Sequence, residues 1–240
     1  MLRELKSFYK KSGRAHLPWR KTKDPYKILV SELMLQQTQV ARVIPKYTAF
    51  LKKFPTWKAL ASAPLSDVLK EWQGLGYNRR AKFLQQTAKI VTEKYKGKFP
   101  KQASEIEELP GIGPYTARAV ATFAFNSPEI FIETNIRTVF THHFFNGRGQ
   151  SSSVHDKEIL PLIERELNKS KMEPRDFYAA LMDYGSHLKA NGIRINNKSK
   201  HYTKQSKFEG SLRQKRAAAL RVALAKGVSE AELLKLLNTK

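Results

Sequence analysis

The sequence predicts an all-α protein, and three observations lead to this expectation. Apolar residues recur at helical spacing through most of the 240 residues. No segment shows the strict apolar–polar alternation of a half-buried strand, and no internal repeat at the period of a solenoid is visible. With 41% hydrophobic residues, the chain can bury one large core or two smaller ones.

Two helices are expected between residues 24 and 51. Asp24-Pro25 is a helix start signal, and an apolar stripe follows it over residues 26–34. The second helix carries its apolar stripe over residues 40–51. Thr38 is its expected N-cap, and Pro45 is expected to kink it.

Further helices follow at regular intervals. One is expected after an N-cap at Ser66 and ends at 74–77, and the next carries apolar residues over 81–91. Ser104 and Glu107 are expected to form a capping box. The later helices are expected to begin around Asn135, to cover about 155–168 and about 174–188, and to close the chain with an amphipathic segment from Leu212 to Leu237.

The segment 109–117 is the most informative part of the chain. Gly111 and Gly113 let the backbone turn tightly with bare N–H groups, and Pro114 suits the first turn of the following helix. The pattern predicts a helix–hairpin–helix that ends near 126–128 and offers an anion site suited to a DNA phosphate. The alternative is an ordinary tight turn between two core helices.

The charge of the chain favours a polyanion partner. The formal net charge is +23, from 44 Lys and Arg against 21 Asp and Glu. A solubilising surface is the alternative. No apolar run reaches the roughly 18–20 residues that span a bilayer, and no signal peptide opens the chain, so no membrane partner and a cytoplasmic, nucleoid-associated location are expected. The absence of cysteine excludes disulfides and any thiolate-held metal.

Two glutamates are the candidates for chemistry. Glu32 lies one helical turn from Ile28 and Leu35, and a carboxyl group there would be desolvated and have a raised pKa. Glu133 comes directly before the helix expected around Asn135. The alternatives are a surface glutamate at position 32 and a carboxylate at position 133 that merely favours the helix dipole.

The order and spacing of several motifs resemble those of MutY-type adenine DNA glycosylases. The match covers roughly residues 1–190, and its most specific part is Glu32 with the Met-Leu-Gln-Gln-Thr segment that ends at Thr38. The other matching segments are Leu17-Pro-Trp-Arg20, Asp24-Pro-Tyr-Lys27, Gly74-Leu-Gly-Tyr77, the hairpin, Glu133-Thr-Asn-Ile-Arg137 and Met182-Asp-Tyr-Gly185.

The resemblance implies a two-lobed helix-hairpin-helix DNA glycosylase fold with DNA bound in the cleft between the lobes. One lobe would be residues 25–130, the second 1–24 with 131–205, and 206–240 a basic helical extension. The partner would be double-stranded DNA with a mispaired or damaged base, bound by a monomer. The implied reaction is monofunctional hydrolysis of an N-glycosidic bond, with adenine opposite 8-oxoguanine or guanine as the expected target. Uracil, hypoxanthine or mismatched thymine is the alternative base, and an inactive DNA-structure-binding protein is the alternative function.

The resemblance also implies roles for individual residues. Glu32 would protonate the base, Glu133 would stabilise the sugar cation, Asn135 would orient a carboxylate or cap its helix, and Tyr115 would close the pocket or merely pack. Base extrusion needs a wedge, a pocket and a phosphate grip. The implied DNA contacts are Gln36, Gln37, Thr38, Leu75, Tyr77, Leu109, Gly111 and Gly113, and the implied base pocket is Leu17, Trp19 and Arg20. For Tyr77 and Trp19 a plain core position is the alternative.

The sequence departs from the family pattern in several places. The cysteine loop that holds an iron–sulfur cluster has no counterpart, Glu133 aligns with the usual catalytic Asp, and Asn78 replaces a second Tyr. The family's C-terminal domain that reads 8-oxoguanine has no match. No metal cofactor is expected, and a monovalent cation at the hairpin carbonyls is an option that no residue requires.

A basic segment after the resemblance is expected to contact DNA. Residues 189–221 contain ten Lys or Arg and a single acid, Glu209. The expected contacts are Lys198, Lys200 and Lys204, and a solvated tail is the alternative.

Overall fold

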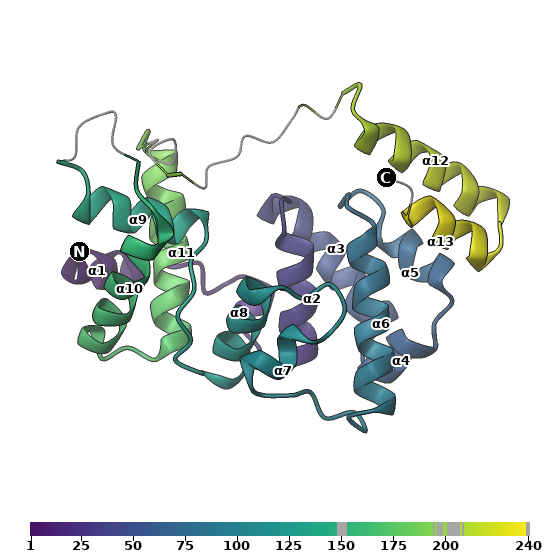
Figure 1. Ribbon diagram of the computed structural model, residues 1–240, viewed down its shortest axis with the longest axis horizontal. Coiled ribbons are helices and arrows are strands. Elements are labelled where there is room, and N and C mark those ends of the chain that lie inside the picture. The colour runs from purple at the N-terminus through teal and green to yellow at the C-terminus, as the bar shows by residue number, and fades with distance from the viewer. Residues whose placement is uncertain (148–152, 194, 196–198, 201–206, 208, 239–240) are drawn as a thin grey trace.

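The computed structural model of the chain describes residues 1–147, 153–193, 195, 199–200, 207 and 209–238 (Figure 1). The described residues fold as helices, with one isolated β-bridge between Val154 and Ser199. The helices are α1 (Leu2–Ser12), the 3₁₀ turn η1 (Pro18–Arg20), α2 (Pro25–Leu35), α3 (Val40–Lys53), α4 (Trp57–Ser62), α5 (Leu65–Trp72), α6 (Arg79–Glu93), α7 (Ala103–Glu107), α8 (Pro114–Phe125), α9 (Thr134–Phe144), α10 (Asp156–Ser170), α11 (Pro174–Ala190), α12 (Leu212–Lys226) and α13 (Glu230–Asn238).

The helices form two groups that lie side by side in Figure 1. One group packs α1, α9 and α10 around α11, so that it joins the N-terminus to a later stretch of the chain. The other group contains α2 to α8, with α2 in contact with α3, α6 and α8. The pair α12–α13 packs beside α5 at the far end of this second group.

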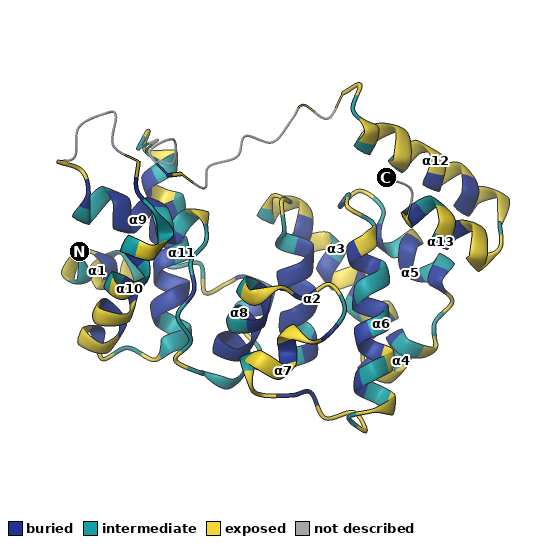
Figure 2. Cartoon of the chain, in the orientation of Figure 1, coloured by how far each residue is buried: buried dark blue, intermediate teal, exposed yellow. Residues whose placement is uncertain are grey.

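Both groups contain many buried residues (Figure 2). Trp72, Tyr26 and Phe50 are fully buried in the larger group, and Phe140 and Phe177 are fully buried in the smaller one. Burial of such side chains stabilises each by about 1.5–3 kcal/mol relative to exposure. The buried side chains of the two groups belong to one continuous apolar cluster, and the cavity described below is lined by residues of both groups.

The expected helix caps and start signals between residues 24 and 107 are right at one position and wrong at three. Asp24 accepts a hydrogen bond from the Tyr26 N–H at 2.9 Å and caps α2, as expected. Thr38 is not the N-cap of α3: Gln39 is, because the Thr38 hydroxyl is used in a bond to the Leu75 carbonyl oxygen at 3.2 Å.

The other two expected caps fail for local reasons. Helix α5 begins at Leu65 after Pro64, which places Ser66 inside the helix rather than before it. Helix α7 is only five residues long and has Gln102 as N-cap, so Glu107 is its last residue and cannot return a bond to its start.

Some elements were not expected from the sequence. These are α1, η1 and the short helix α4. The final amphipathic segment, expected from Leu212 to Leu237, forms two helices. Gly227 adopts φ +67° and ends α12 in the left-handed conformation. Within the described residues, no helix combines the length and the apolarity that a membrane crossing requires.

Candidate active site

A cavity of about 360 Å³ lies between the two groups of helices. Both groups and the N-terminal loop contribute to its wall. The lining residues are Arg14, Leu17, Trp19, Arg20, Ile28, Ser31, Glu32, Leu35, Gln36, Gln37, Thr38, Val40, Tyr115, Phe123, Glu133, Thr134, Asn135 and Met182. The cavity thus brings together residues that are up to 168 positions apart in the sequence, and Glu32 and Glu133 face the same space.

Glu32 stands in an apolar surrounding on α2. The eight residues from Tyr26 to Met34 other than Lys27 are all buried, and Glu32 itself is 9% exposed. Burial raises the pKa of its carboxyl group to about 7, and the nearby Glu133 carboxylate adds to the rise, while Arg20 and a hydrogen bond from Tyr115 oppose it. A carboxylic acid with this pKa is partly protonated at neutral pH. The structure places Glu32 in the desolvated position that the sequence led us to expect, and not on the surface.

Tyr115 holds the Glu32 carboxyl group from the start of α8. Its hydroxyl donates to Glu32 Oε2 at 3.4 Å, and its ring packs edge-on against Phe131 with centroids 5.7 Å apart. Burial, followed by the charges of the two glutamates, raises the pKa of Tyr115 well above its usual value. The phenol therefore stays neutral and acts as a hydrogen-bond donor.

Glu133 is the N-cap of α9. Its Oε1 accepts from the backbone N–H groups of Asn135 at 2.7 Å and Ile136 at 2.9 Å, and its Oε2 accepts from Asn135 Nδ2 at 3.2 Å. Burial raises the pKa of Glu133, and the two backbone bonds oppose that rise. The cap of α9 is therefore Glu133 and not Asn135. The Asn135 side chain orients the Glu133 carboxylate.

Gly185 on the neighbouring helix α11 leaves room for the first turn of α9, which carries Glu133 and Asn135. A Cβ atom built on Gly185 of α11 would lie 2.2 Å from the Asn135 carbonyl oxygen. Real Cβ atoms do not approach backbone so closely, so only glycine lets α11 pack this tightly against the first turn of α9.

Arg20 brings a positive charge to the cavity wall. Its Nη2 lies 3.6 Å from Asp183 Oδ1, and its guanidinium is 5.3 Å from the centre of the Phe123 ring. Asp183 is buried and also accepts from Arg14 at the backbone N–H and Nε, both at 2.8 Å. Arg20 Nη1 is buried and has no hydrogen-bond partner among the described residues. An unpaired buried donor costs free energy, so an acceptor on a ligand in this cavity would be bound favourably.

Leu17 and Trp19 complete this side of the cavity. They are 2% and 7% exposed, and the Trp19 ring packs edge-on against Tyr47 with centroids 5.5 Å apart. Trp19 is therefore both a core side chain and part of the cavity wall. The two alternatives for Trp19, base pocket and core position, thus do not exclude each other.

Arg80 joins the two loops at the mouth of the cavity. Its guanidinium donates to the Leu33 and Gln36 carbonyl oxygens at the end of α2, and to the Leu75 and Gly76 carbonyl oxygens of the 74–77 loop. Burial lowers the pKa of Arg80 to about 10, which leaves it charged at neutral pH. The residue therefore fixes the 74–77 loop to the helix that carries Glu32.

Both loops contain a non-glycine residue with positive φ. Gln37 has φ 55° and Tyr77 has φ 46°, and both are exposed. Such residues cost of order 1 kcal/mol or more and are enriched at functional sites. Leu75, expected as part of the wedge, is 4% exposed and belongs to the core, so Tyr77 is the side chain that this loop presents to solvent.

The hairpin between α7 and α8 has the expected shape. Leu109 is buried and anchors it, while Gly111 and Gly113 are exposed at its tip. Gly111 has φ +72°, and a Cβ atom there would lie 2.5 Å from the Phe83 ring. The hairpin can thus approach α6 closely only with glycine at this position.

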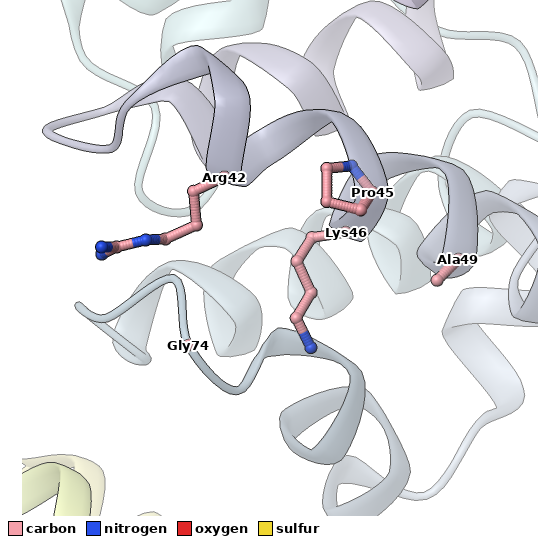
Figure 3. A pocket seen from close by; sticks show the side chains of 5 residues that line it. All are labelled: Arg42, Pro45, Lys46, Ala49 and Gly74. Carbon is pink, nitrogen blue, oxygen red and sulfur yellow. The ribbon is translucent and has the colours of Figure 1, made fainter.

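A basic hollow of about 620 Å³ opens beside the 74–77 loop (Figure 3). Lys46 extends from α3 toward the loop at Gly74, Arg42 extends from the same helix to one side, and Pro45 and Ala49 lie on the helix next to Lys46. The sequence analysis did not single out Arg42 or Lys46. The 74–77 loop contacts Thr38 of the cavity wall through the Leu75 carbonyl oxygen. Two cations next to this loop suit a phosphate of a bound polyanion.

The structure describes only part of the expected basic segment. Lys200 is exposed, and its N–H donates to the Val154 carbonyl oxygen at 3.2 Å. Lys198 and Lys204 lie outside the described residues. Their role in DNA binding stays a prediction.

Sequence reasoning missed Arg14, Arg80 and Asp183. Asp183 stands inside the segment Met182–Gly185 that carried the family resemblance, and this membership was the available signal, because its partner Arg14 is 169 positions away. Arg80 gave no signal, because its partners are carbonyl oxygens up to 47 positions away.

The chain is similar to known DNA repair proteins. The model of a family described as HhH-GPD superfamily base excision DNA repair protein matches residues 30–165. An adenine DNA glycosylase of Buchnera aphidicola subsp. Baizongia pistaciae is 36% identical over 211 residues, which make up 85% of this chain and 58% of the relative. An adenine DNA glycosylase of Mycolicibacterium smegmatis is 40% identical over 184 residues, 76% of this chain and 61% of the relative.

Two solved structures resemble the fold. A thermostable thymine-DNA glycosylase is 28% identical with a TM-score of 0.65, covering 77% of this chain and 84% of that one. An endonuclease III–DNA complex is 21% identical with a TM-score of 0.59, covering 78% and 81%, and shows likeness of fold alone. The chain spans about three fifths of the length of the two curated relatives.

Proposed function

The chain belongs to the HhH-GPD superfamily of base excision DNA repair proteins, and on that premise we propose that it is a monofunctional DNA glycosylase that removes adenine from mispairs. The observation that carries the proposal is the pair of carboxyl groups on one cavity. Glu32 is buried with a pKa raised to about 7, and Glu133 is held by three hydrogen bonds from its own helix start. Adenine is the proposed base because the curated relatives are adenine DNA glycosylases.

The two glutamates divide the reaction between them. The Glu32 carboxyl group donates its proton to a ring nitrogen of the extruded base, N7 in the case of adenine. The bond between C1′ and the base then breaks, and its electron pair leaves with the base. The positive charge that develops on the sugar is stabilised by the Glu133 carboxylate.

Water completes the hydrolysis. It attacks C1′ and returns a proton to the Glu32 carboxylate, so the products are the free base and an abasic site. Tyr115 keeps the Glu32 carboxyl group in place, and Arg20 Nη1 offers a donor to an acceptor of the base. Trp19 supplies an apolar wall for the base.

The remaining features support DNA binding. The hairpin at Gly111 and Gly113 presents backbone at the start of α8, where a phosphate is favoured. Tyr77 is the exposed aromatic of the loop beside the cavity and suits the role of wedge. Base extrusion needs both a phosphate grip and a wedge.

No iron–sulfur cluster fits the residues of this chain. Such clusters are held by cysteine thiolates, and the sequence contains no cysteine. We also propose that the chain does not cleave the strand, because the position two residues after the hairpin, where related bifunctional enzymes carry a lysine, is Tyr115. Borohydride should therefore trap no covalent complex with DNA.

The proposal is tested by a base-release panel under single-turnover conditions. The duplexes carry adenine opposite 8-oxoguanine, guanine or cytosine, and, separately, uracil, hypoxanthine and a T:G mispair. Wild-type protein should release adenine fastest. Glu32→Gln and Glu133→Gln should each slow release by about a hundredfold or more, because each removes a group that acts in the transition state.

Glu93→Gln is the matched control, because Glu93 is an exposed glutamate at the end of α6. This variant should release adenine at the wild-type rate. If wild-type protein binds the duplexes but releases no base from any of them, the chain is an inactive DNA-structure-binding protein. Fastest release of another base would replace adenine as the substrate.

A further inference from the structure

We propose that Arg213 contacts the base opposite the excised one and favours guanine there. This inference rests on the proposed function, because it requires DNA at the cavity mouth. Arg213 lies in the first turn of α12 and donates from Nη1 to the Tyr77 hydroxyl at 3.0 Å. Its guanidinium is 5.6 Å from the centre of the Tyr77 ring. A base that stacks beside Tyr77 therefore comes within reach of Arg213.

The position of Arg213 is set by packed elements. Leu233 and Leu237 of α13 are 1% and 7% exposed, and α13 packs against α5 of the larger group. Lys82 of α6 donates to Asn238 Oδ1 at 3.2 Å and holds the end of α13. Figure 1 shows the pair beside α5 and α6, on the group that carries Tyr77. The α12–α13 pair thus places Arg213 next to Tyr77, although the two residues are 136 positions apart in the sequence.

The surface around this contact suits a nucleic acid. Helix α12 carries five Lys or Arg and no Asp or Glu. Among the described residues, the exposed large apolar or aromatic side chains are Tyr77, Leu212 and Val222. Tyr77 contacts Arg213, and Leu212 precedes Arg213 in the first turn of α12. Cations next to exposed rings and apolar side chains are the usual combination where proteins hold unstacked bases.

The chemistry of the guanidinium selects the base. Arg donates two parallel hydrogen bonds to the O6 and N7 acceptors of guanine, which is the commonest specific contact of proteins with DNA. Cytosine offers no such pair on that edge. Arg213 also donates from Nη2 to the Lys207 carbonyl oxygen at 3.4 Å. The Tyr77 hydroxyl and this carbonyl oxygen are single acceptors on different groups, whereas a guanine edge offers two acceptors in one plane that match the guanidinium, so Arg213 can turn from them to the base.

The test measures binding, so that it does not depend on base release. The probes are two duplexes with a stable abasic-site analogue placed opposite guanine or opposite cytosine. Wild-type protein should bind the guanine duplex more tightly. Arg213→Ala should reduce the ratio of the two affinities by about tenfold, because a bidentate arginine–guanine contact discriminates by roughly five- to a hundredfold. Arg213→Lys keeps the charge and should lose most of the ratio as well.

Arg221→Ala is the matched control, because Arg221 is an exposed arginine on the same helix. It should leave the ratio of affinities unchanged. The proposal is overturned if wild-type protein shows no preference for guanine, if Arg213→Ala weakens both duplexes equally, or if it tightens both, which would make the Tyr77 contact autoinhibitory. If the protein releases no adenine in the base panel but still binds the guanine duplex more tightly, the result would count against the proposed reaction and not against the role of Arg213.

Discussion

At the scale of single residues, the same chemical group is placed in two different environments on one cavity. The Glu32 carboxyl group has apolar neighbours and one hydrogen bond from Tyr115, and its pKa is raised to about 7. The Glu133 carboxylate accepts three hydrogen bonds at a helix start, where negative charge is favoured. Burial raises the pKa of both groups, but the backbone hydrogen bonds at the helix start favour the charged form of Glu133 and oppose the rise there. Glu32 is therefore the better placed to give a proton and Glu133 to stabilise a positive charge, as paired carboxylates do in glycoside hydrolysis.

The raised pKa of Glu32 has two consequences. As pH rises, base release by the wild type should slow, and the stability of Glu32→Gln relative to the wild type should increase. Base release needs the protonated acid, so the single-turnover rate at saturating enzyme should fall about tenfold per pH unit above about pH 7. The folded pKa lies above the unfolded value of 4.5, so the stability that the protonated group contributes is lost as pH rises from 4.5 through 7. Glu32→Gln should therefore gain stability relative to wild type at pH 8, by up to about 3 kcal/mol.

Thermal unfolding at pH 5 and pH 8 checks this prediction. The difference in melting temperature between Glu32→Gln and wild type should be larger at pH 8. A difference that does not change with pH would show that Glu32 titrates near its ordinary value and would remove it as the general acid. Glu93→Gln, at an exposed site, should show no such pH dependence.

At the scale of elements, the site depends on how closely α11 approaches α9. Gly185→Ala would place a Cβ atom 2.2 Å from the Asn135 carbonyl oxygen and 2.7 Å from its carbonyl carbon. Backbone cannot give way as a side chain does, so α9 and α11 must move apart, which changes the position of the Glu133 carboxylate relative to α11. We expect a loss of about 1–3 kcal/mol in the free energy of unfolding, and a loss of base release that exceeds the loss of folded protein.

Urea unfolding and single-turnover assays on the same samples measure the two losses. Gly147→Ala is the matched control, because nothing lies within 4 Å of a Cβ atom built there. It should leave both quantities near their wild-type values. Wild-type base release by Gly185→Ala would show that the position of Glu133 does not depend on this contact.

The elements also show how far the sequence could predict the site. The start of α2 follows from Asp24, and the burial of Glu32 follows from the apolar residues around it, so both were predicted from local pattern. The caps at Thr38 and Ser66 were wrong because a distant carbonyl group and Pro64 decided those helix starts. Arg80 and Asp183 were missed because their partners are distant in the sequence and come together only in the fold.

At the scale of the whole molecule, the net charge of +23 leaves open which cations contact DNA. The structure places one pair, Arg42 and Lys46, in the hollow beside the 74–77 loop (Figure 3). That loop also carries Tyr77 and is fixed to α2 by Arg80, so a duplex that meets Tyr77 must pass close to this pair. We expect each of the two cations to neutralise one phosphate.

The double variant Arg42→Ala and Lys46→Ala should therefore flatten the salt dependence of DNA binding. Each lost phosphate contact lowers the slope of log K against log salt by about 0.9, so the expected change is about 1.8. Phosphate contacts carry no base information, so the preference among opposite bases should not change. Lys52→Ala with Lys58→Ala removes the same charge from exposed positions on α3 and α4 away from the hollow. An equal flattening by this control pair would mean that the overall charge, rather than the hollow, determines how the protein holds DNA.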